Sequence, residues 1–535
     1  MRHPYTAPLL ILFLAATSTT THAQNFFTHL PVDGYGGGWQ LNAGENGGVR
    51  LVSSLPTGGE LVLGEAGNII SGMILSDDEV GQPLFVSEMV QVGTTERLAL
   101  GQMDNGTGTL TGRTMYLARI IDGATSTEAT TIGPEDNTEW SSDLALHPDG
   151  AVVLGRTLFG PTNDLRYRMI VAKFDADLAP QWGVTVDVLD KVMFPVKAFV
   201  DPASGAITTY SLVDTPGPTD FYGSLVKLSS AGELLWSYSY DCEDNGFYNG
   251  GIVQDEAGDF YTVQQLANFN TLDLVLSKIT SDGELLWSKK ISAPQPGSVA
   301  NVHWHNGAIY VAGTAGFTGG TQNALLVKLD TEGQAQWAHV YGVADRLTIG
   351  NDVLFTTGTD GEEALWLSGY FRLNGTSPQD VLWMKLNADG TGMDCSLADY
   401  VFTTTPTTST TIEDGVATPY TYFGTRTLGI NTFAAGEPVY ECGAPPNGIA
   451  EAAIALAQVA PVPTHGPCTV SFPAAHGALR TRVLNALGQQ VQEHSVAPNA
   501  PTLQLDLGGA ESGTYVLLTE ELKSGRRSAQ RVVWE

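Results

Sequence analysis

Three features of this sequence predict an all-β fold: a roughly seven-bladed β-propeller of four-stranded blades, followed by a small C-terminal β-sandwich. A motif of strand, turn and tryptophan recurs about every 50 residues, a period typical of propeller blades. Only 16% of the residues are charged, and glycine is abundant, as in chains made of strands and turns. Beyond residue 445 the motif stops, and short alternating runs indicate a second domain.

Residues 1–23 have the layout of a secretory signal peptide. Arg2 gives a positive start, residues 9–16 are an apolar run, and Thr21-His22-Ala23 ends the segment, so we expect cleavage after Ala23. A membrane anchor is the alternative, but so short a run spans about 12 Å as a helix, against a hydrocarbon core of roughly 30 Å. No cysteine follows the run, which disfavours a lipoprotein, and no other stretch predicts a transmembrane segment.

Residues 24–400 carry the repeat. Four copies align without gaps and place a lysine nine residues before a tryptophan; the tryptophans are Trp182, Trp236, Trp287 and Trp337. A fifth copy keeps Lys385 but has Asp394 in the tryptophan position. Two degenerate copies upstream put Phe85 in the tryptophan position and Arg119 in the lysine position. These copies together set the predicted number of blades.

One copy shows how four strands arise. Residues 330–333 predict a turn in which Asp330 accepts backbone N–H groups and Gly333 adopts a positive φ. Asn306-Gly307, between two alternating runs, predicts a second hairpin. Each copy is therefore four antiparallel strands. Its tryptophan is expected to be a structural wedge between neighbouring blades, burying roughly 150–250 Å².

The repeat, written Lys-Leu-Asp-x-x-Gly-x-x-x-Trp, resembles that of a group of secreted β-propellers. It is similar, more distantly, to the quinoprotein propellers with tryptophan-docking repeats, but those have one more residue between Asp and Gly. That difference argues against a quinone cofactor. The resemblance covers about residues 70–400 and implies architecture rather than activity.

Residues 401–445 leave the repeat and are expected to close the propeller. Their Thr-rich runs predict strands that close the ring with residues 25–70 or lie across one face. Export allows disulfides, and we expect Cys395 to pair with Cys442. The other cysteines, Cys242 and Cys468, fall in different domains and can stay unpaired. No CxxC motif for zinc or redox chemistry is present.

After a linker at 446–458, residues 459–535 predict a separate β-sandwich. Its motif residues are Pro461, Pro463, Gly466, Gly488, Gly513 and Tyr515. They resemble the type A C-terminal sorting domain of the type IX secretion system, although the chain ends in Trp534-Glu535 instead of lysine. The resemblance implies the type IX machinery as a partner, removal of the tag, and a secreted or cell-surface protein. A C-terminal adhesion or carbohydrate-binding module is the alternative.

The negative charge is concentrated in the propeller. Residues 25–450 hold 19 Lys and Arg against 50 Asp and Glu, within a net charge of −31. Such a surface repels nucleic acid and anionic membranes; it can attract Ca²⁺ or simply keep a secreted protein soluble. Asp241, Glu243 and Asp244 are weak Ca²⁺ candidates, and His303 and His305 a weak metal pair. No other cofactor is expected.

No nucleophile elbow, zincin, P-loop or dinucleotide motif is present, so no catalytic residue is assigned. Loops between second and third strands mix aromatic and polar residues, which suits a sugar or peptide ligand; the candidates are Phe159, Phe221, Tyr222, Phe269 and Phe317. The sequence favours a non-catalytic binding protein for a glycan or a protein. One alternative is an extracellular hydrolase or lyase, which needs carboxyl groups with perturbed pKa values in the central funnel. Another is a structural surface or matrix component.

Overall fold

The computed structural model divides the chain into two compact units, Met1–Gly443 and Ala444–Glu535. It describes residues 25–30, 38–53, 59–77, 84–104, 113–133, 138–158, 167–188, 191–214, 221–242, 246–267, 270–316, 322–343, 346–373, 379–392, 396–399, 401–413, 415–433, 438–442, 458–460, 467–472, 478–485, 490–508, 512–521 and 527–534. The predicted signal peptide, Cys395 and almost all of the predicted linker lie outside these ranges.

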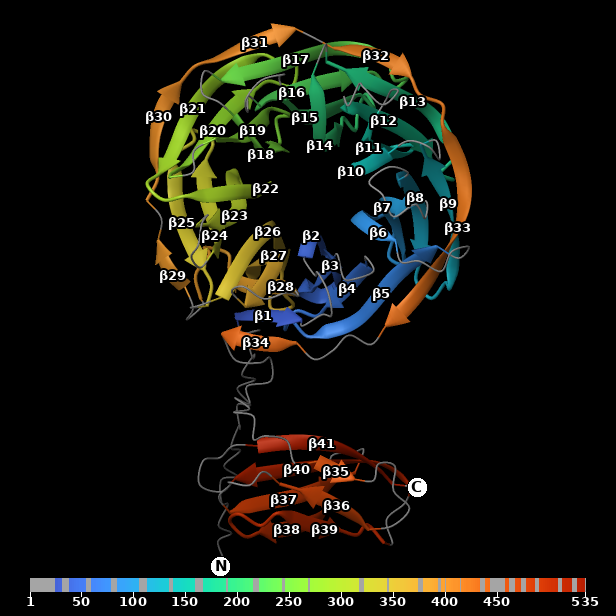
Figure 1. Cartoon of the computed structure of the whole chain (residues 1–535), viewed down its shortest axis with the longest axis vertical. Coiled ribbons are helices and arrows are strands. Elements are labelled where there is room, and N and C mark those ends of the chain that lie inside the picture. The colour runs from blue at the N-terminus through green and yellow to red at the C-terminus, as the bar shows by residue number, and fades with distance from the viewer. Residues whose placement is uncertain are drawn as a thin grey trace, which may run out of the picture. The chain divides into compact units, whose positions relative to one another are not determined.

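The first unit consists of four-stranded antiparallel repeats arranged around an axis (Figure 1). Repeat by repeat, the strands are β2 (Gly38–Ala43), β3 (Val49–Ser53), β4 (Gly59–Leu63), β5 (Ile69–Asp77); β6 (Phe85–Gln91), β7 (Glu96–Asp104), β8 (Arg113–Ile121), β9 (Ser126–Ile132); β10 (Thr138–His147), β11 (Gly150–Leu158), β12 (Tyr167–Asp175), β13 (Pro180–Asp187); β14 (Val192–Val200), β15 (Ile207–Asp214), β16 (Phe221–Leu228), β17 (Leu234–Cys242); β18 (Gly246–Gln254), β19 (Phe260–Leu266), β20 (Leu272–Ile279), β21 (Leu285–Ala293); β22 (Gly297–His305), β23 (Ala308–Ala315), β24 (Asn323–Asp330), β25 (Ala335–Tyr341); and β26 (Arg346–Thr357), β27 (Glu363–Leu373), β28 (Asp380–Asn387). The short 3-10 turn η1 (Glu45–Gly47) joins β2 to β3. The first strand of each repeat lies nearest the axis (Figure 1), so the unit is a β-propeller.

The repeats pack face to face, and their cores lie between consecutive sheets. The middle strands are buried almost throughout, as in β15, β19 and β23, because another sheet covers each of their faces. One core cluster, for example, joins Val263 and Leu276 of one repeat to Val311 and Val327 of the next. Each sheet therefore gains stability by burying apolar surface against its neighbours.

The N-terminal segment completes the last repeat. β1 (Phe26–Leu30) pairs antiparallel with β28 and serves as its fourth strand. Phe26 faces Lys385 in this register, as Trp337 faces Lys328 in the preceding repeat. The aromatic residue missing at Asp394 is therefore supplied from the other end of the unit, and pairing of the two ends closes the ring.

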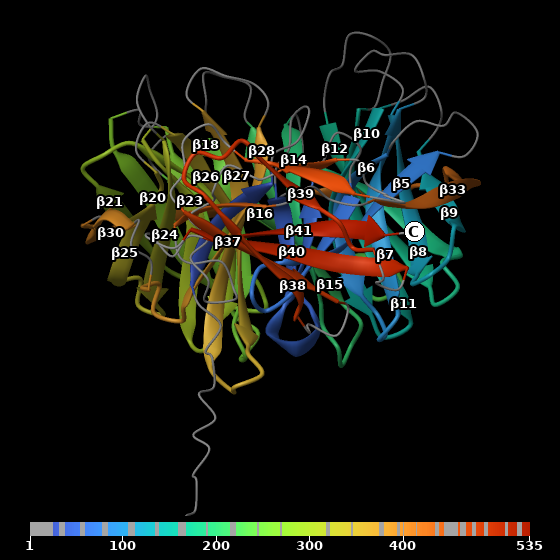
Figure 2. The same cartoon turned by 90° about the horizontal axis from the view of Figure 1, so that it is seen from below.

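The described residues between Ser396 and Cys442 form a belt around the outside of the propeller (Figures 1 and 2). Its strands are β29 (Ser396–Asp399), β30 (Thr403–Thr407), β31 (Ser409–Glu413), β32 (Val416–Pro419), β33 (Phe423–Phe433) and β34 (Val439–Cys442). In chain order they pair antiparallel with β25, β21, β17, β13, then both β9 and β5, and finally β1. The belt thus covers the outer edge strand of each repeat, which would otherwise be open to pairing with other chains.

The belt also explains the sheet count. The repeats that begin with β14, β18, β22 and β26 form separate five-stranded sheets, whereas β2–β13 belong to one larger sheet. β33 joins two repeats within it, and β10 pairs with β8 at a single residue, Thr138. The all-β propeller architecture is confirmed, and the roughly seven-bladed count stays a prediction.

The repeated tryptophans pack against the turn of the next repeat. A Cβ added to Gly232, Gly283 or Gly390 would lie within 3.3 Å of the ring of Trp182, Trp236 or Trp337. Trp287 lies against Gly333, and Phe26 takes the same place against Gly67. These glycines have positive φ, so they supply both the turn and a flat surface for the ring. The alignment that put Phe85 in the tryptophan position is wrong, because Phe85 begins the innermost strand β6.

The turns have the predicted chemistry. Asp330 Oδ1 accepts the N–H groups of Glu332 at 3.0 Å and Gln334 at 2.8 Å, and Gly333 has a φ of 72°. Asp175 and Asp255 accept two N–H groups each in the same way in other repeats. Local sequence therefore sets these turns.

The second unit is a β-sandwich of two sheets. One sheet has the order β35 (Gln458–Ala460), β36 (Cys468–Ser471), β39 (Thr502–Leu505), and the other β38 (Gln490–Val496), β37 (Leu479–Leu484), β40 (Gly513–Glu521), β41 (Arg527–Trp534). Cys468, Val470, Leu517 and Trp534 are among the side chains buried between the sheets. Trp534, the departure from the sorting-domain pattern, is 8% exposed and so contributes to this core.

Candidate functional site

The innermost strands share a β-bulge at the same level of the propeller. In β2, β6, β10, β14, β22 and β26 the residue after the register shift is polar; these residues are Gln40, Glu88, Asp143, Lys197, Asn301 and Asp352. A bulge redirects a side chain out of the normal alternation. Equivalent bulges therefore bring polar groups from distant parts of the chain to the axis.

Most of these side chains bond to the next repeat. The N–H of Leu41 donates to Asp352 Oδ2 at 2.7 Å, and that of Met89 donates to Gln40 Oε1 at 2.9 Å. The N–H of Leu144 donates to Glu88 Oε2 at 2.5 Å, and that of Ala198 donates to Asp143 Oδ2 at 2.7 Å. In the β18–β21 repeat Gln265 does the same, since its Oε1 accepts the N–H of Val299 at 3.1 Å. We call this set the axial latch. It satisfies N–H groups that the bulges remove from the ladder.

Three carboxyl groups of the latch surround one lysine. Glu88 and Asp143 share a side-chain hydrogen bond, and burial, followed by the Asp143 charge, raises the pKa of Glu88 well above its usual range. Burial raises the pKa of Asp352 to about 6. Burial alone would lower the pKa of Lys197, but Asp143, Glu88 and Asp352 outweigh it and raise that pKa.

Carboxyl groups with perturbed pKa values therefore do converge at the axis, as an enzyme would require. Their hydrogen bonds to backbone N–H groups give them a structural task as well, because an unpaired buried N–H is destabilising. Among the described residues, no three His, Cys, Asp or Glu side chains gather where they could hold a metal ion.

An aromatic cluster lies where β10, β12, β14 and β16 begin, at the end of the propeller that we call the loop face. Trp140 and Tyr167 meet edge to face at 5.1 Å, Tyr167 and Phe194 lie 6.2 Å apart, and Phe194 and Phe221 lie 5.7 Å apart. The guanidinium carbon of Arg156 is 4.7–5.0 Å from the first three rings. All five side chains are half-buried. We call them the aromatic platform.

The platform is held by two neighbouring repeats. Trp140 faces Arg156 across the β10–β11 pair, and Leu158 faces Tyr167 across β11–β12. Phe194 and Phe221 come from β14 and β16 of the next repeat. Packing between the rings lowers the pKa of Arg156, because burial disfavours its charged form. The cluster can stack a flat ligand and offer it a cationic hydrogen-bond donor.

Of the predicted loop-face residues, Phe221 lies in this platform. Tyr222 is 2% exposed and packs in the core. Phe159, Phe269 and Phe317 lie outside the described residues. The sequence analysis missed Trp140, Arg156, Tyr167 and Phe194 because it considered only the loops between second and third strands. The row of aromatic residues near strand starts could have identified the three rings.

The structure describes only some of the predicted metal candidates. Asp241 is half-buried on β17, and Glu243 and Asp244 lie outside the described residues. His305 stacks on Phe355 at 3.8 Å and its Nε2 is 2.8 Å from Glu363 Oε1. Burial lowers the pKa of His303 to about 4. Cys442 and Cys395 offer no test of the predicted disulfide, because the first has no described side chain and the second lies outside the described ranges. Cys242 and Cys468 are buried.

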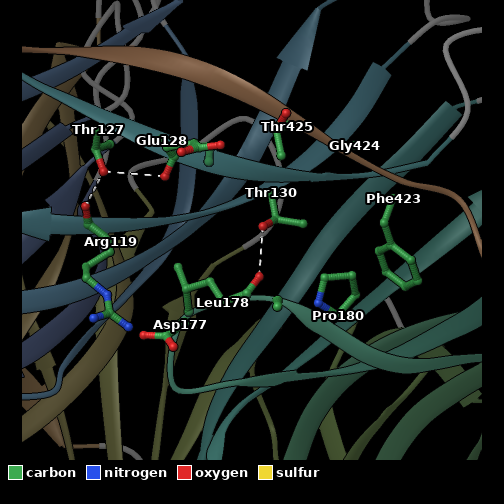
Figure 3. A pocket seen from close by; sticks show the side chains of 12 residues that line it. Arg119, Thr127, Glu128, Thr130, Asp177, Leu178, Pro180, Phe423, Gly424 and Thr425 are labelled. Atoms are coloured by element: carbon green, nitrogen blue, oxygen red, sulfur yellow. Dashed lines mark hydrogen bonds between the residues drawn. The ribbon is translucent and has the colours of Figure 1, made fainter.

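A cavity of about 550 Å³ lies on the rim between β9, the β12–β13 turn and β33 (Figure 3). Thr130 Oγ1 donates to the carbonyl of Leu178 at 2.9 Å, and Thr127 Oγ1 donates to that of Arg119 at 2.6 Å. Leu178 has a φ of 61° and is 6% exposed. Its side chain therefore fills part of this junction between two repeats.

The sequence matches one known family at its C-terminal end. The secretion system C-terminal sorting domain matches residues 458–533, which confirms the predicted sorting domain. The chain is therefore exported to the cell surface or the medium by the type IX secretion system. No helix among the described residues is long and apolar enough to cross a membrane. No curated protein matches the sequence.

Several solved structures are similar over part of the chain. A protein of unknown function from Bacteroides caccae is 14% identical, with a TM-score of 0.30, over 51% of this chain and 90% of its own. A β-1,3-galactosidase of glycoside hydrolase family 43 is 10% identical, with a TM-score of 0.30, over 59% and 95%. An exo-β-1,3-galactanase from Clostridium thermocellum is 12% identical, with a TM-score of 0.28, over 73% and 82%.

Proposed function

We propose that this chain is a secreted or cell-surface propeller that binds an extracellular glycan on its loop face. The observation that carries the proposal is the aromatic platform, in which Arg156 lies against three half-buried rings. Sugars are bound by stacking of their apolar faces on aromatic rings together with a few fixed polar groups. The platform combines these two elements at the end of the propeller that carries the aromatic loops.

Trp140 is the residue to change first, because it is the largest ring of the platform. The exported protein would be screened on a glycan panel, and binding of the best glycan would be measured by calorimetry. Trp140→Ala should weaken binding about tenfold or more, since it removes a stacking surface of about 1.4 kcal/mol or more.

Tyr422 supplies the matched control, because it is 48% exposed on the belt. Tyr422→Ala should leave glycan affinity unchanged. Binding to no glycan, or equal loss in both variants, would rule the platform out as a glycan site. Binding of a protein instead would redirect the proposal to a protein ligand.

A hydrolase is the second candidate, favoured by one observation. Glu88 and Asp143 share a hydrogen bond beside Lys197 at the axis, and such a pair can hold and release a proton. Release of reducing ends from a bound glycan, abolished by Glu88→Gln with binding retained, would support it. Binding without turnover would contradict it.

The proposal includes three covalent changes that accompany export. The N-terminal segment is removed after Ala23, supported by its signal-peptide layout, and the sorting domain is removed on arrival. A Cys395–Cys442 bond then fastens the belt, in a compartment that permits disulfides. Intact-mass measurement of the secreted protein, with and without reductant, tests all three.

A further inference from the structure

Aromatic rings fill the outer part of several junctions between repeats. At each, the ring from one repeat lies on the positive-φ glycine of the next turn, as Trp182 lies on Gly232 and Phe26 on Gly67. The residue opposite the ring is the repeated lysine, as in the pairs Lys328–Trp337 and Lys385–Phe26. This register identifies the equivalent position in any repeat.

The junction after the β2–β5 repeat lacks the ring. Val62 pairs with Ser71 immediately before the bulge, so these residues take the places of the lysine and the tryptophan, and Ser71 is exposed. In the next turn, the N–H of Ala124 donates to Ile121 O at 3.1 Å, as that of Gly333 donates to Asp330 O. Ala124 therefore stands where the other turns have glycine.

The following junction, where the rim cavity of about 550 Å³ lies, is partly filled by a side chain. There the tryptophan position is also lost, but Leu178 replaces the turn glycine and keeps its positive φ of 61°. Its side chain is 6% exposed and belongs to the core. At the Ser71 junction, neither a ring from one side nor a large side chain from the other fills the space.

A cavity of about 610 Å³ occupies this junction. Its lining includes Val62, Ser71, Ile121 and Ile430, and Ile70, 65% exposed, lies at its mouth. Cavities of this size are typical of small-molecule and side-chain sites. The belt strand β33, which carries Ile430, lies along its outer side.

The floor of the cavity is charged and incompletely bonded. Glu60 is 2% exposed; its Oε2 lies 3.1 Å from Arg50 Nη1 and 3.3 Å from Arg97 Nε. Arg97 Nη1 is in turn 2.6 Å from Asp122 Oδ1. The other oxygen, Glu60 Oε1, is buried and has no hydrogen-bond partner among the described residues. A buried carboxylate oxygen normally has a hydrogen-bond donor as its partner.

We propose that this cavity binds an indole ring in place of the missing wedge, with the indole N–H donating to Glu60 Oε1. An indole N–H already donates to a carboxylate elsewhere in the protein, because Trp304 Nε1, on the innermost strand β22, donates to Glu256 Oε1 at 2.9 Å. A cation already lies near one wedge ring, because Lys289 Nζ is 4.7 Å from the centre of the Trp287 ring. Arg50, also in the lining, supplies the equivalent cation for the bound ring. The site is separate from the aromatic platform and does not depend on the proposed glycan function.

N-acetyl-tryptophanamide is the first probe, titrated into the secreted protein by calorimetry, with N-acetyl-alaninamide as the blank. We expect saturable binding of the tryptophan compound only. Ser71→Trp restores the wedge, so it should abolish binding and raise Tm. The matched control is Leu286→Trp, at the exposed position before the wedge Trp287 and outside the cavity, which should bind the probe as the unchanged protein does.

No binding of the tryptophan compound, or undiminished binding to a folded Ser71→Trp protein, would overturn the proposal. If Ser71→Trp does not fold, Ala124→Leu decides, because Leu178 shows that a turn leucine can enter such a junction. A tryptophan-containing hexapeptide separates the two sources of indole. Tighter binding of the peptide than of the amide identifies a partner chain, and equal binding identifies a free indole compound.

Discussion

Glu139 is fully buried, and its Oε2 has no hydrogen-bond partner among the described residues. Its Oε1 accepts a hydrogen bond from the Thr157 hydroxyl at 3.0 Å. The hydroxyl of Tyr420, on the belt, is also buried without a hydrogen-bond partner among the described residues. Burial, with a contribution from the negative charge of Glu139, raises the pKa of Tyr420. Burial raises the pKa of Glu139 to about 8. We therefore expect this carboxyl group to make the stability of the propeller depend on pH.

Stability should fall as the pH rises from about 4.5 to about 8, because the folded state keeps a proton on Glu139 that the unfolded state releases in this window. The loss is on the order of 4 kcal/mol. Glu139→Gln should remove most of this decline, measured as the urea midpoint at about pH 5 and about pH 9. Glu128→Gln, at an exposed glutamate, should keep it. A decline of equal size in both variants would show that Glu139 is not its cause.

One contact recurs between the outer strand of one repeat and a turn of the next repeat. The ring of Trp182 lies on Gly232, and its Nε1 donates to the carbonyl of Ser230 in the same turn at 3.0 Å. Lys227 Nζ donates to the carbonyl of Ser281 in the following turn at 2.9 Å. The lysine, glycine and tryptophan of the repeat therefore join consecutive sheets.

Gly232→Ala tests this contact. The new Cβ would lie 2.8 Å from the Trp182 ring at a φ of 83°, so backbone strain and a clash add, and we expect a loss of about 2–4 kcal/mol. Gly361→Ala is the control, since its φ is 85° but no atom lies within 4 Å of the new Cβ. Thermal unfolding of both should show the larger drop in Tm for Gly232→Ala. Equal drops would mean that the ring contributes nothing.

The axial latch leads to a second prediction for these elements. Asp143→Ala leaves the N–H of Ala198 without its acceptor, which should lower stability by about 1–3 kcal/mol. Asp143→Asn keeps an acceptor oxygen at the same place and should lose much less. Denaturant midpoints separate the two, and similar midpoints would argue against a latch.

The sequence predicted what is local and repeated. The hairpin turns, the repeated lysine and tryptophan, and the sorting domain follow from short spacings. The closing strand did not, because Phe26 is separated from Lys385, its partner, by almost the whole unit. The axial latch uses different polar residues in each repeat, such as Gln40 and Asp143, so no shared residue marks it. Of the platform, only Phe221 was predicted, because it lies at the end of a predicted loop between second and third strands, whereas the other members lie within predicted strands.

The belt determines which strand edges of the propeller are exposed to solvent. Its strands pair with the outer strands of the repeats in reverse chain order, from β25 back to β5 and then β1. Uncovered outer strands would present free N–H and C=O groups for pairing between molecules. The belt therefore serves solubility as well as stability.

Deleting residues 396–442 removes the belt and leaves the sequence of the repeats unchanged. The variant should self-associate, because the outer strands of its repeats become open edges. Size-exclusion chromatography with light scattering should show a larger particle or aggregate for the deletion variant than for the unchanged protein. A soluble monomer with unchanged Tm would mean that the belt has neither role.

The central proposal is that the exported propeller binds a glycan at the aromatic platform. Hydrogen–deuterium exchange, with and without a glycan selected from the panel, tests the central proposal most directly. We predict that protection appears in peptides at the starts of β10, β12, β14 and β16, which hold Trp140, Tyr167, Phe194 and Phe221. Protection confined to the axis or the rim, with these four starts unchanged, would contradict it.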